Sequence, residues 1–233
     1  NYCPDWYRGL EYPKERERGY ESTEDLLTPG YFEMPIKKGE SIIFSAGIAP
    51  IKPKEISVLL EKERESLDHR DSFYHCLVNA AHQFRVTKDG ENYLLAGYPW
   101  FKPRARDTFI SMPGLTLAIG EKERFEMYMA TASKAIYNLI RKEPLEVDIY
   151  EMEQPDTLLW AIWCIQQYAK YTSRTACYEK YGVLLRDIIE YVRSGKHPNL
   201  FIHENGLVYA NGRDHAITWM NSTANGRAVV PRS

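Results

Sequence analysis

The clearest structural signal in this chain is the stretch Phe125-Glu-Met-Tyr-Met-Ala-Thr-Ala-Ser-Lys-Ala-Ile-Tyr-Asn-Leu139. Its apolar residues recur three and four positions apart, so they fall along one face of a helix. These residues are Phe125, Tyr128, Met129, Ala132, Ile136 and Leu139. The pattern predicts an amphipathic helix that packs one face into a core and ends before Pro144.

Two further helices are predicted on the N-terminal side of this stretch. Asp71 is placed to cap the first of them. Its apolar positions follow the same helical spacing and are Phe73, Leu77, Ala80, Ala81 and Phe84. The second is expected to begin near Asp107, run to about Ile119 and end at Gly120.

Two helices are also predicted on the C-terminal side. The first starts after Pro155 and is apolar nearly all round its first two turns, so we expect it to be buried. The second carries Tyr181, Leu184, Leu185, Ile188 and Val192 and ends at Gly195. Five helices with little strand signal between them indicate a mainly α fold of stacked antiparallel helical hairpins. A hairpin is expected around 206–209 in the loop-rich segment that follows.

The first fifty residues have a different character. Prolines and glycines interrupt them throughout, which is typical of turns and extended segments. Residues 41–48 have the composition of a strand. We therefore predict a short β-containing arm over 1–50 and a helical part over 51–233.

Composition excludes several classes of protein. The chain has 233 residues, with 30 basic and 32 acidic side chains, which is not the charge balance of a nucleic-acid-binding protein. The longest apolar run, Leu158 to Ile165, is far shorter than the roughly 18–20 residues that span a bilayer. No signal peptide is visible, and the four cysteines form no CxxC pair. A cytoplasmic chain with reduced cysteines is the expectation.

Motifs for metals, nucleotides and a serine nucleophile are missing. Of six histidines, His75 and His82 share a helical face, but no HExxH or paired-cysteine spacing accompanies them. There is no GxGxxG, Walker or GxSxG sequence. We expect neither a metal nor a cofactor.

The densest cluster of functional side chains lies at the start of the predicted second helix. Trp100 and Phe101 precede Arg104, Arg106 and Asp107. Asp107 could simply cap the helix, with Arg106 paired locally. Alternatively, an Arg–Asp pair beside a tryptophan offers charged hydrogen-bonding groups to sugar hydroxyls and an apolar face to the sugar ring.

Two other segments have similar chemistry. Asp156 and Trp160 are four residues apart, so they share one face at a helix start. An acid favoured by the helix dipole beside a core tryptophan is the simpler explanation of this pair taken alone. Trp219 lies in the loop-rich C-terminal stretch near Glu204 and Asp214, where it could equally fill the core.

Together these segments resemble the C-terminal amylo-α-1,6-glucosidase domain of glycogen debranching enzymes. The resemblance rests on Gly97-Tyr-Pro-Trp-Phe101, Arg106-Asp-Thr-Phe-Ile-Ser-Met-Pro-Gly114, Asp156-Thr-Leu-Leu-Trp160, Glu204-Asn-Gly-Leu-Val-Tyr209 and Thr218-Trp-Met220. The arm from Tyr7-Arg8 to Gly30-Tyr31-Phe32 is similar to the family's link from an N-terminal β domain. The resemblance covers nearly the whole chain.

It implies an (α/α)6 barrel and inverting hydrolysis of the α-1,6-linked glucose left at a trimmed branch point of glycogen or limit dextrin. Trp100, Arg106 and Asp107 are expected to line the glucose pocket, with Asp156, Trp160 and Trp219 nearby. The residue after Thr-Trp-Met is the family's general acid, and a second carboxylate must activate water. This chemistry needs no metal or nucleotide.

Position 221 departs from the family, because it is Asn where the family has Asp. An amide has no carboxyl proton to donate, and acid catalysis is typically worth ~10²–10⁴ in rate. The substitution fits a substrate trap, a natural loss of activity, or an acid displaced to another residue such as Asp214. The family's general base is expected beyond Ser233, which suggests an incomplete barrel that could self-associate or join a preceding domain.

Two other functions fit the same residues. A non-catalytic α-glucan-binding protein would keep the pocket and lose the acid. A different glycosidase on the same barrel, similar to glucoamylase or trehalase, would prefer α-1,4 or α,α-1,1 bonds over branch points.

Overall fold

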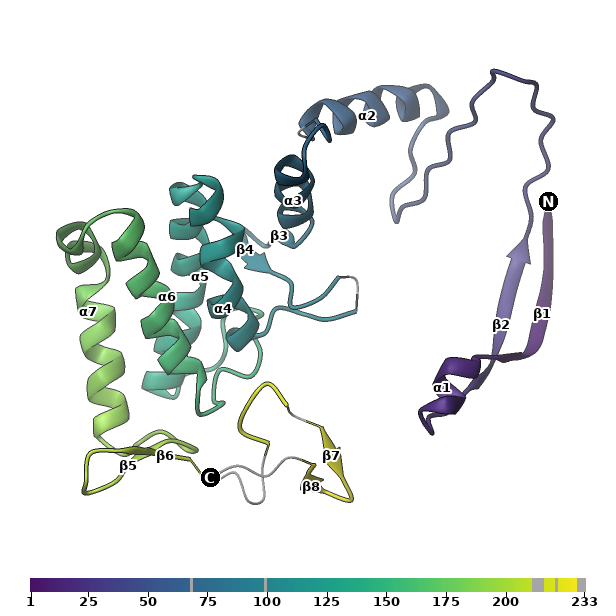
Figure 1. Ribbon diagram of the computed structural model, residues 1–233. Helices are drawn as coiled ribbons and strands as arrows, with labels where there is room; N and C mark the ends of the chain where they lie inside the picture. Colours follow the sequence, from purple (N-terminus) through teal and green to yellow (C-terminus); the bar gives the residue numbers. More distant parts are fainter. Residues whose placement is uncertain (68, 99, 211–215, 221, 230–233) are drawn as a thin grey trace. The chain divides into compact units, whose positions relative to one another are not determined.

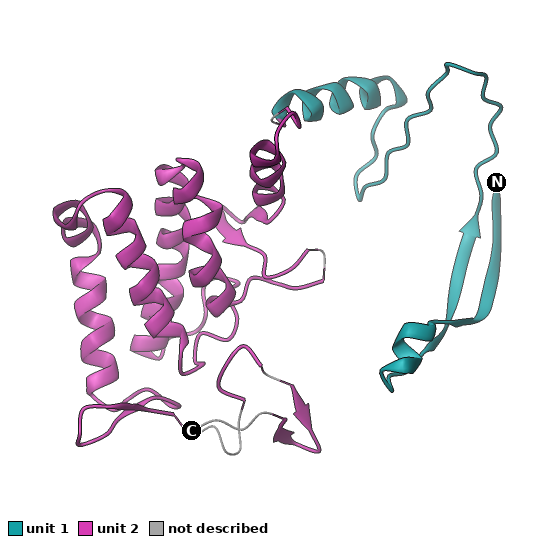
Figure 2. Cartoon of the chain, in the orientation of Figure 1, with its two compact units in different colours: residues 1–66 teal, residues 67–233 magenta. Residues whose placement is uncertain are grey.

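The computed structural model describes residues 1–67, 69–98, 100–210, 216–220 and 222–229. The chain divides into two compact units, residues 1–66 and 67–233 (Figure 2). This division is based on the contacts within each unit. It does not test the predicted boundary between the arm (1–50) and the helical part (51–233), which stays a prediction.

The first unit is built on one long hairpin. Strand β1 (Tyr2–Glu11) pairs antiparallel with β2 (Thr23–Gly30), and the short helix α1 (Pro13–Glu17) lies between them. Helix α2 (Pro53–Ser66) ends the unit. The strand predicted at 41–48 is wrong, because that segment has no regular structure. A strand forms only where a partner pairs its backbone groups, and that pairing occurs earlier in the chain.

The second unit is mainly helical, so the predicted α class is confirmed. Its α-helices are α3 (Phe73–His82), α4 (Ala105–Leu115), α5 (Lys122–Arg141), α6 (Thr157–Tyr171) and α7 (Arg174–Arg193). Helices α4 to α7 lie side by side (Figure 1). Helix α4 ends at Leu115, earlier than the predicted end near Ile119, and a separate 3-10 turn, η1 (Leu117–Ile119), leads to the predicted stop at Gly120.

The core lies between α4, α5, α6 and α7, and Phe109 and Met112 of α4 are fully buried in it. The predicted apolar stripe of α5 is buried from Phe125 to Ile136, and most of the predicted α7 stripe is buried as well. The rings of Phe125 and Tyr168 stack with centroids 5.2 Å apart, and Tyr181 meets Tyr168 edge-on at the same distance. Burial, together with a hydrogen bond to Glu126, raises the pKa of Tyr168 to about 12. These aromatic contacts link α5, α6 and α7 within that core.

Helix α6 differs from the prediction on one face. Leu158, Ala161 and Ile165 are fully buried as expected. Leu159 and Trp163 are not, because their face of the helix borders a cavity. A uniformly apolar helix therefore supplies both core and cavity wall.

Helix α3 corrects two predictions. Its N-cap is Ser72, whose hydroxyl accepts a hydrogen bond from the His75 backbone amide, rather than Asp71. The expected apolar stripe is largely exposed, with Phe73 80% accessible. The buried residues of α3 are Val78, Asn79 and Ala81, since these are the ones that face the rest of the unit.

A hairpin that the sequence analysis missed precedes α4. Strand β3 (Arg85–Lys88) pairs with β4 (Glu91–Leu94) through a turn at Asp89 and Gly90, both with positive φ. Asp-Gly is a strong signal for this kind of turn. Glu91 joins the hairpin to α5, where it accepts a hydrogen bond from Thr131 and pairs with Lys134.

Short strand pairs lie in the described part of the C-terminal segment. The predicted hairpin around 206–209 is confirmed, since β5 (Phe201–Ile202) pairs with β6 (Val208–Tyr209). Strands β7 (Thr223–Ala224) and β8 (Arg227–Ala228) form a second small pair. Across the described part of the chain, no helix has the length and apolar character to cross a membrane.

Candidate functional site

Arg106 and Asp156 form a bidentate ion pair between α4 and the start of α6. Nε and Nη2 of Arg106 donate to the two carboxylate oxygens of Asp156 at 2.7 and 2.8 Å. The Arg106 side chain is only 8% exposed and that of Asp156 is 26% exposed. The guanidinium is therefore desolvated and depends on this carboxylate for its charge balance.

Local structure explains why Asp156 is available for this pairing. It is the N-cap residue of α6, yet its side chain makes no capping hydrogen bond. The same carboxylate accepts a third hydrogen bond, from the indole Nε1 of Trp160 at 3.2 Å. The predicted shared face of Asp156 and Trp160 is thus confirmed, while Arg106 pairs across 50 residues rather than locally.

This network borders a cavity of about 520 Å³. The lining residues are Arg106, Ile110, Asp156, Leu159, Trp160, Trp163, Thr218 and Trp219. Four residues singled out from the sequence are therefore brought together: Arg106, Asp156, Trp160 and Trp219. They come from two helices and the C-terminal segment.

Trp163 is a lining residue that the sequence analysis missed. Its ring meets that of Trp160 edge-on, with centroids 5.5 Å apart and planes at 85°. The available signal was its position, three residues after Trp160 on the same helix. The surrounding apolar run concealed it, because it suggested burial on all sides.

Asp107 and Trp100 do not line this cavity. Asp107 is the third residue of α4, whose N-cap is Arg104, so it does not cap the helix. It is exposed and borders a separate cavity of about 200 Å³, which shares Ile110 with the first. Trp100 is 85% exposed and borders a third cavity of about 450 Å³ with Phe101.

The position of the family's general acid, Asn221, lies outside the described residues, as does Asp214. Thr218 and Trp219, just before position 221, both line the cavity of Arg106 and Asp156.

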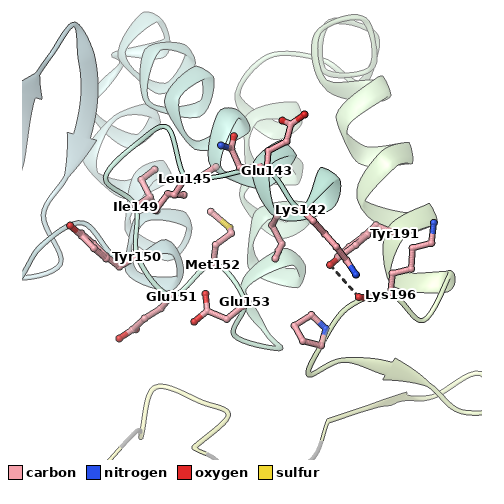
Figure 3. A pocket seen from close by; sticks show the side chains of 14 residues that line it. Lys142, Glu143, Leu145, Ile149, Tyr150, Glu151, Met152, Glu153, Tyr191 and Lys196 are labelled. Atoms are coloured by element: carbon pink, nitrogen blue, oxygen red, sulfur yellow. Dashed lines mark hydrogen bonds between the residues drawn. The ribbon is translucent and has the colours of Figure 1, made fainter.

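A further cavity, of about 560 Å³, lies on the segment that follows α5 and beside the end of α7 (Figure 3). Its lining includes positively and negatively charged side chains, namely Lys142, Glu143, Glu151, Glu153 and Lys196. The Tyr191 hydroxyl donates to the Lys196 carbonyl at 3.4 Å. No residue predicted from the sequence to be functional lines it. Among the described residues, no group of His, Cys, Asp or Glu is arranged to hold a metal ion.

The Arg106 cavity combines two kinds of wall. The Arg106–Asp156 pair supplies hydrogen-bonding groups, and the side chains of Trp160, Trp163 and Trp219 supply most of the apolar lining. Sugars have both features, a rim of hydroxyls and faces of C–H groups. Mostly apolar walls with a few placed polar groups are typical of small-molecule sites. The site therefore has the features of a binding site for a small polar ligand.

Comparison with known families defines the chain further. The model of the amylo-alpha-1,6-glucosidase family matches residues 75–233. The chain belongs to this family. The model described as glycogen debranching enzyme N terminal matches residues 1–43. Searches of curated proteins and of solved structures returned no match.

Membership confirms the resemblance inferred from the sequence motifs. It makes the chain a relative of glycoside hydrolases that act on α-glucan.

Proposed function

We propose that this chain takes part in glycogen debranching, by inverting hydrolysis of the α-1,6-linked glucose at branch points of glycogen or limit dextrin. The observation that carries the proposal is the cavity in which the Arg106–Asp156 pair meets Trp160 and Trp219. It joins residues from three separate sequence motifs of the amylo-alpha-1,6-glucosidase family.

In this proposal the terminal glucose binds at the polar end of the cavity. Asp156 accepts a hydrogen bond from a sugar hydroxyl at Oδ1, the oxygen to which only Arg106 Nη2 donates. Trp160 and Trp219 supply apolar surface for the sugar ring. Asp107 contributes contacts from the adjoining cavity, which shares Ile110 with this one. Trp100 contributes from the next cavity, which shares Leu95 with that of Asp107.

The reaction also needs a proton donor for the departing glycosidic oxygen. The family places that acid at position 221, where this chain has Asn. A second carboxylate, about 6.5–9.5 Å from the acid, activates the water in an inverting enzyme. Without a donor at position 221, hydrolysis is expected to be slower by ~10²–10⁴.

Asn221 favours a second candidate function, an α-glucan-binding protein without catalysis. Such a protein retains the sugar-binding cavity and lacks the acid. The two candidates share the ligand and differ in whether a bond is broken.

We also propose that residues 51–233 form the N-terminal part of an (α/α)6 barrel and residues 1–50 a linking arm. Support comes from the side-by-side arrangement of α4 to α7 and from the Arg106–Asp156 and Trp160 contacts at the N-terminal ends of α4 and α6. Sites in helical folds are commonly built from side chains on facing helices.

Binding and hydrolysis together test the proposal. Limit dextrin is titrated into the chain by calorimetry, and binding is expected to be lost in Asp156→Asn. Glucose release is then compared for Asn221→Asp and for Asn225→Asp, both made in the longest open reading frame that contains these 233 residues.

A rise in glucose release of ~10²–10⁴ for Asn221→Asp alone supports the hydrolase. Binding without release from Asn221→Asp supports the glucan-binding protein. Absence of limit-dextrin binding refutes both. Preference for α-1,4 or α,α-1,1 bonds would identify another glycosidase.

A further inference from the structure

His197 is a buried histidine in the segment that follows α7, with only 1% of its surface exposed. Its ring packs edge-on against that of Tyr191, with centroids 5.9 Å apart. Its Nδ1 accepts a hydrogen bond from the backbone amide of Asn199 at 3.1 Å. A neutral imidazole that accepts at Nδ1 carries its proton on Nε2. In the described part of the chain, that Nε2 is buried and has no hydrogen-bond partner.

Asn199 extends this contact to a second segment of the chain. Its side-chain Nδ2 donates to the backbone carbonyl of Glu153 at 3.0 Å. Glu153 lies on the segment that leads to Asp156 at the start of α6. Glu153 and Lys196 both line the cavity of about 560 Å³, so its walls come from both segments (Figure 3). The hydrogen bonds of His197 and Asn199 therefore join the chain after α7 to the chain before α6 beside this cavity.

A protonated ring does not fit this arrangement. A charged imidazole carries hydrogen on both nitrogens, so Nδ1 can no longer accept from the Asn199 amide. In the described part of the chain, the titratable groups that act on the ring are the Glu153 carboxylate, which favours its charged form, and Tyr191, whose own pKa burial raises. The side chain of the neighbouring Lys196 is exposed. Burial outweighs the attraction of Glu153 and lowers the pKa of His197, so the folded arrangement keeps the ring neutral.

We infer that His197 and Asn199 form a pH-sensitive latch between the segment before α6 and the segment after α7. The neutral ring holds the Asn199 amide, and the Asn199 side chain holds Glu153. As pH falls below about 6.5, a ring that leaves its buried position takes up a proton, and the released form is favoured. Release frees Glu153 from the Lys196 side of the cavity, which opens the space between the two segments.

Hydrogen–deuterium exchange of the full chain, followed by mass spectrometry of its peptides, tests the latch. Rates at about pH 7.5 and about pH 5.0 are divided by the intrinsic rates of unstructured peptides at the same pH, since only the opening equilibrium is of interest. On this scale the Asn199 amide should exchange about five- to thirtyfold faster at the lower pH, a range set by linkage to the ordinary histidine pKa of about 6.5. The turn at 151–154 should respond in the same direction. The buried middle of α6, at Ala161 and Ile165, should not respond.

Three variants locate the source of the response. His197→Asn supplies a carbonyl oxygen that can accept from the same amide and does not titrate, so the response at Asn199 should disappear. Asn199→Ala removes the bond to Glu153, so exchange at 151–154 should be fast at both pH values. His203→Asn is the matched control, because His203 makes the same Nδ1 contact, with the Asn205 amide at 3.3 Å, but is exposed. It should leave the response at Asn199 intact.

No pH response in the original chain, or one that persists in His197→Asn, would overturn the inference. An equal rise in the middle of α6 would also overturn it, because that result means unfolding of the whole unit. If His197→Asn does not fold, Asn199→Ala decides: loss of the response at 151–154 supports the latch, and a persisting response refutes it. Exchange is measured without ligand, so these outcomes do not depend on whether the chain binds a glucan.

Discussion

Replacing Asp156 by alanine removes every acceptor that Arg106 uses in the described structure. The carboxylate accepts two hydrogen bonds from Arg106 and one from Trp160. In Asp156→Ala the guanidinium stays almost fully buried without its partner, and breaking such a pair typically costs 3–5 kcal/mol. Because Asp156 is partly exposed, water can compensate in part. We expect a loss of about 3 kcal/mol in the free energy of unfolding.

The measurement is urea unfolding followed by tryptophan fluorescence, together with thermal unfolding. A loss of about 3 kcal/mol corresponds to a fall in Tm of roughly 6–12 °C for a unit of this size. Glu190→Ala is the control, because Glu190 is exposed and pairs with Arg186 only at 3.9 Å. Surface pairs of this kind contribute about 0–1 kcal/mol.

A double variant decides whether the unpaired charge is the cause. Arg106→Met combined with Asp156→Ala removes both charges, so it should be more stable than Asp156→Ala alone. Asp156→Ala with the stability of the original chain would refute the reasoning. So would a double variant that loses the sum of both single effects.

Three further substitutions test the fold. Burial lowers the pKa of His197 in the folded chain. As pH falls through about 6.5, the unfolded chain therefore takes up a proton before the folded chain does. The free energy of unfolding should fall between pH 7.5 and 5.5 as a result. His197→Asn should flatten this fall in urea midpoints; an unchanged slope would show that His197 is not its source. Gly90→Ala should destabilise the β3–β4 hairpin by about 1–2 kcal/mol, because φ is +79° there. Gly114→Ala, inside α4 with open space for a methyl group, should instead stabilise by about 0.5–1 kcal/mol, and equal signs for the two variants would contradict the backbone explanation.

Helix prediction succeeded where burial followed periodicity. Helices α5 and α7 carry long amphipathic stripes with polar opposite faces, so the pattern alone indicates which side is buried. It failed for α3, whose stripe is mostly exposed. A short helix has too few residues for its pattern to determine how it docks, and its neighbours decide which face is covered.

The candidate site was predictable residue by residue but not as an arrangement. Asp156 and Trp160 could be paired from their spacing, since one helix determines their geometry. Nothing in the spacing of Arg106 and Asp156 indicates that they bond across 50 residues. Trp163 was hidden for the same reason, since no local rule shows that one side of an apolar helix borders a cavity.

The sequence by itself determined the helical class, the main amphipathic faces, the family and the Asn at position 221. These features are local or are carried by ordered motifs, so they can be recognised without coordinates. Only the tertiary structure decided that Arg106 bonds Asp156, that Asp107 and Trp100 border other cavities, and that Trp163 stays exposed. Such contacts depend on how separate helices pack, and packing brings together residues whose distance along the chain carries no information about their contact.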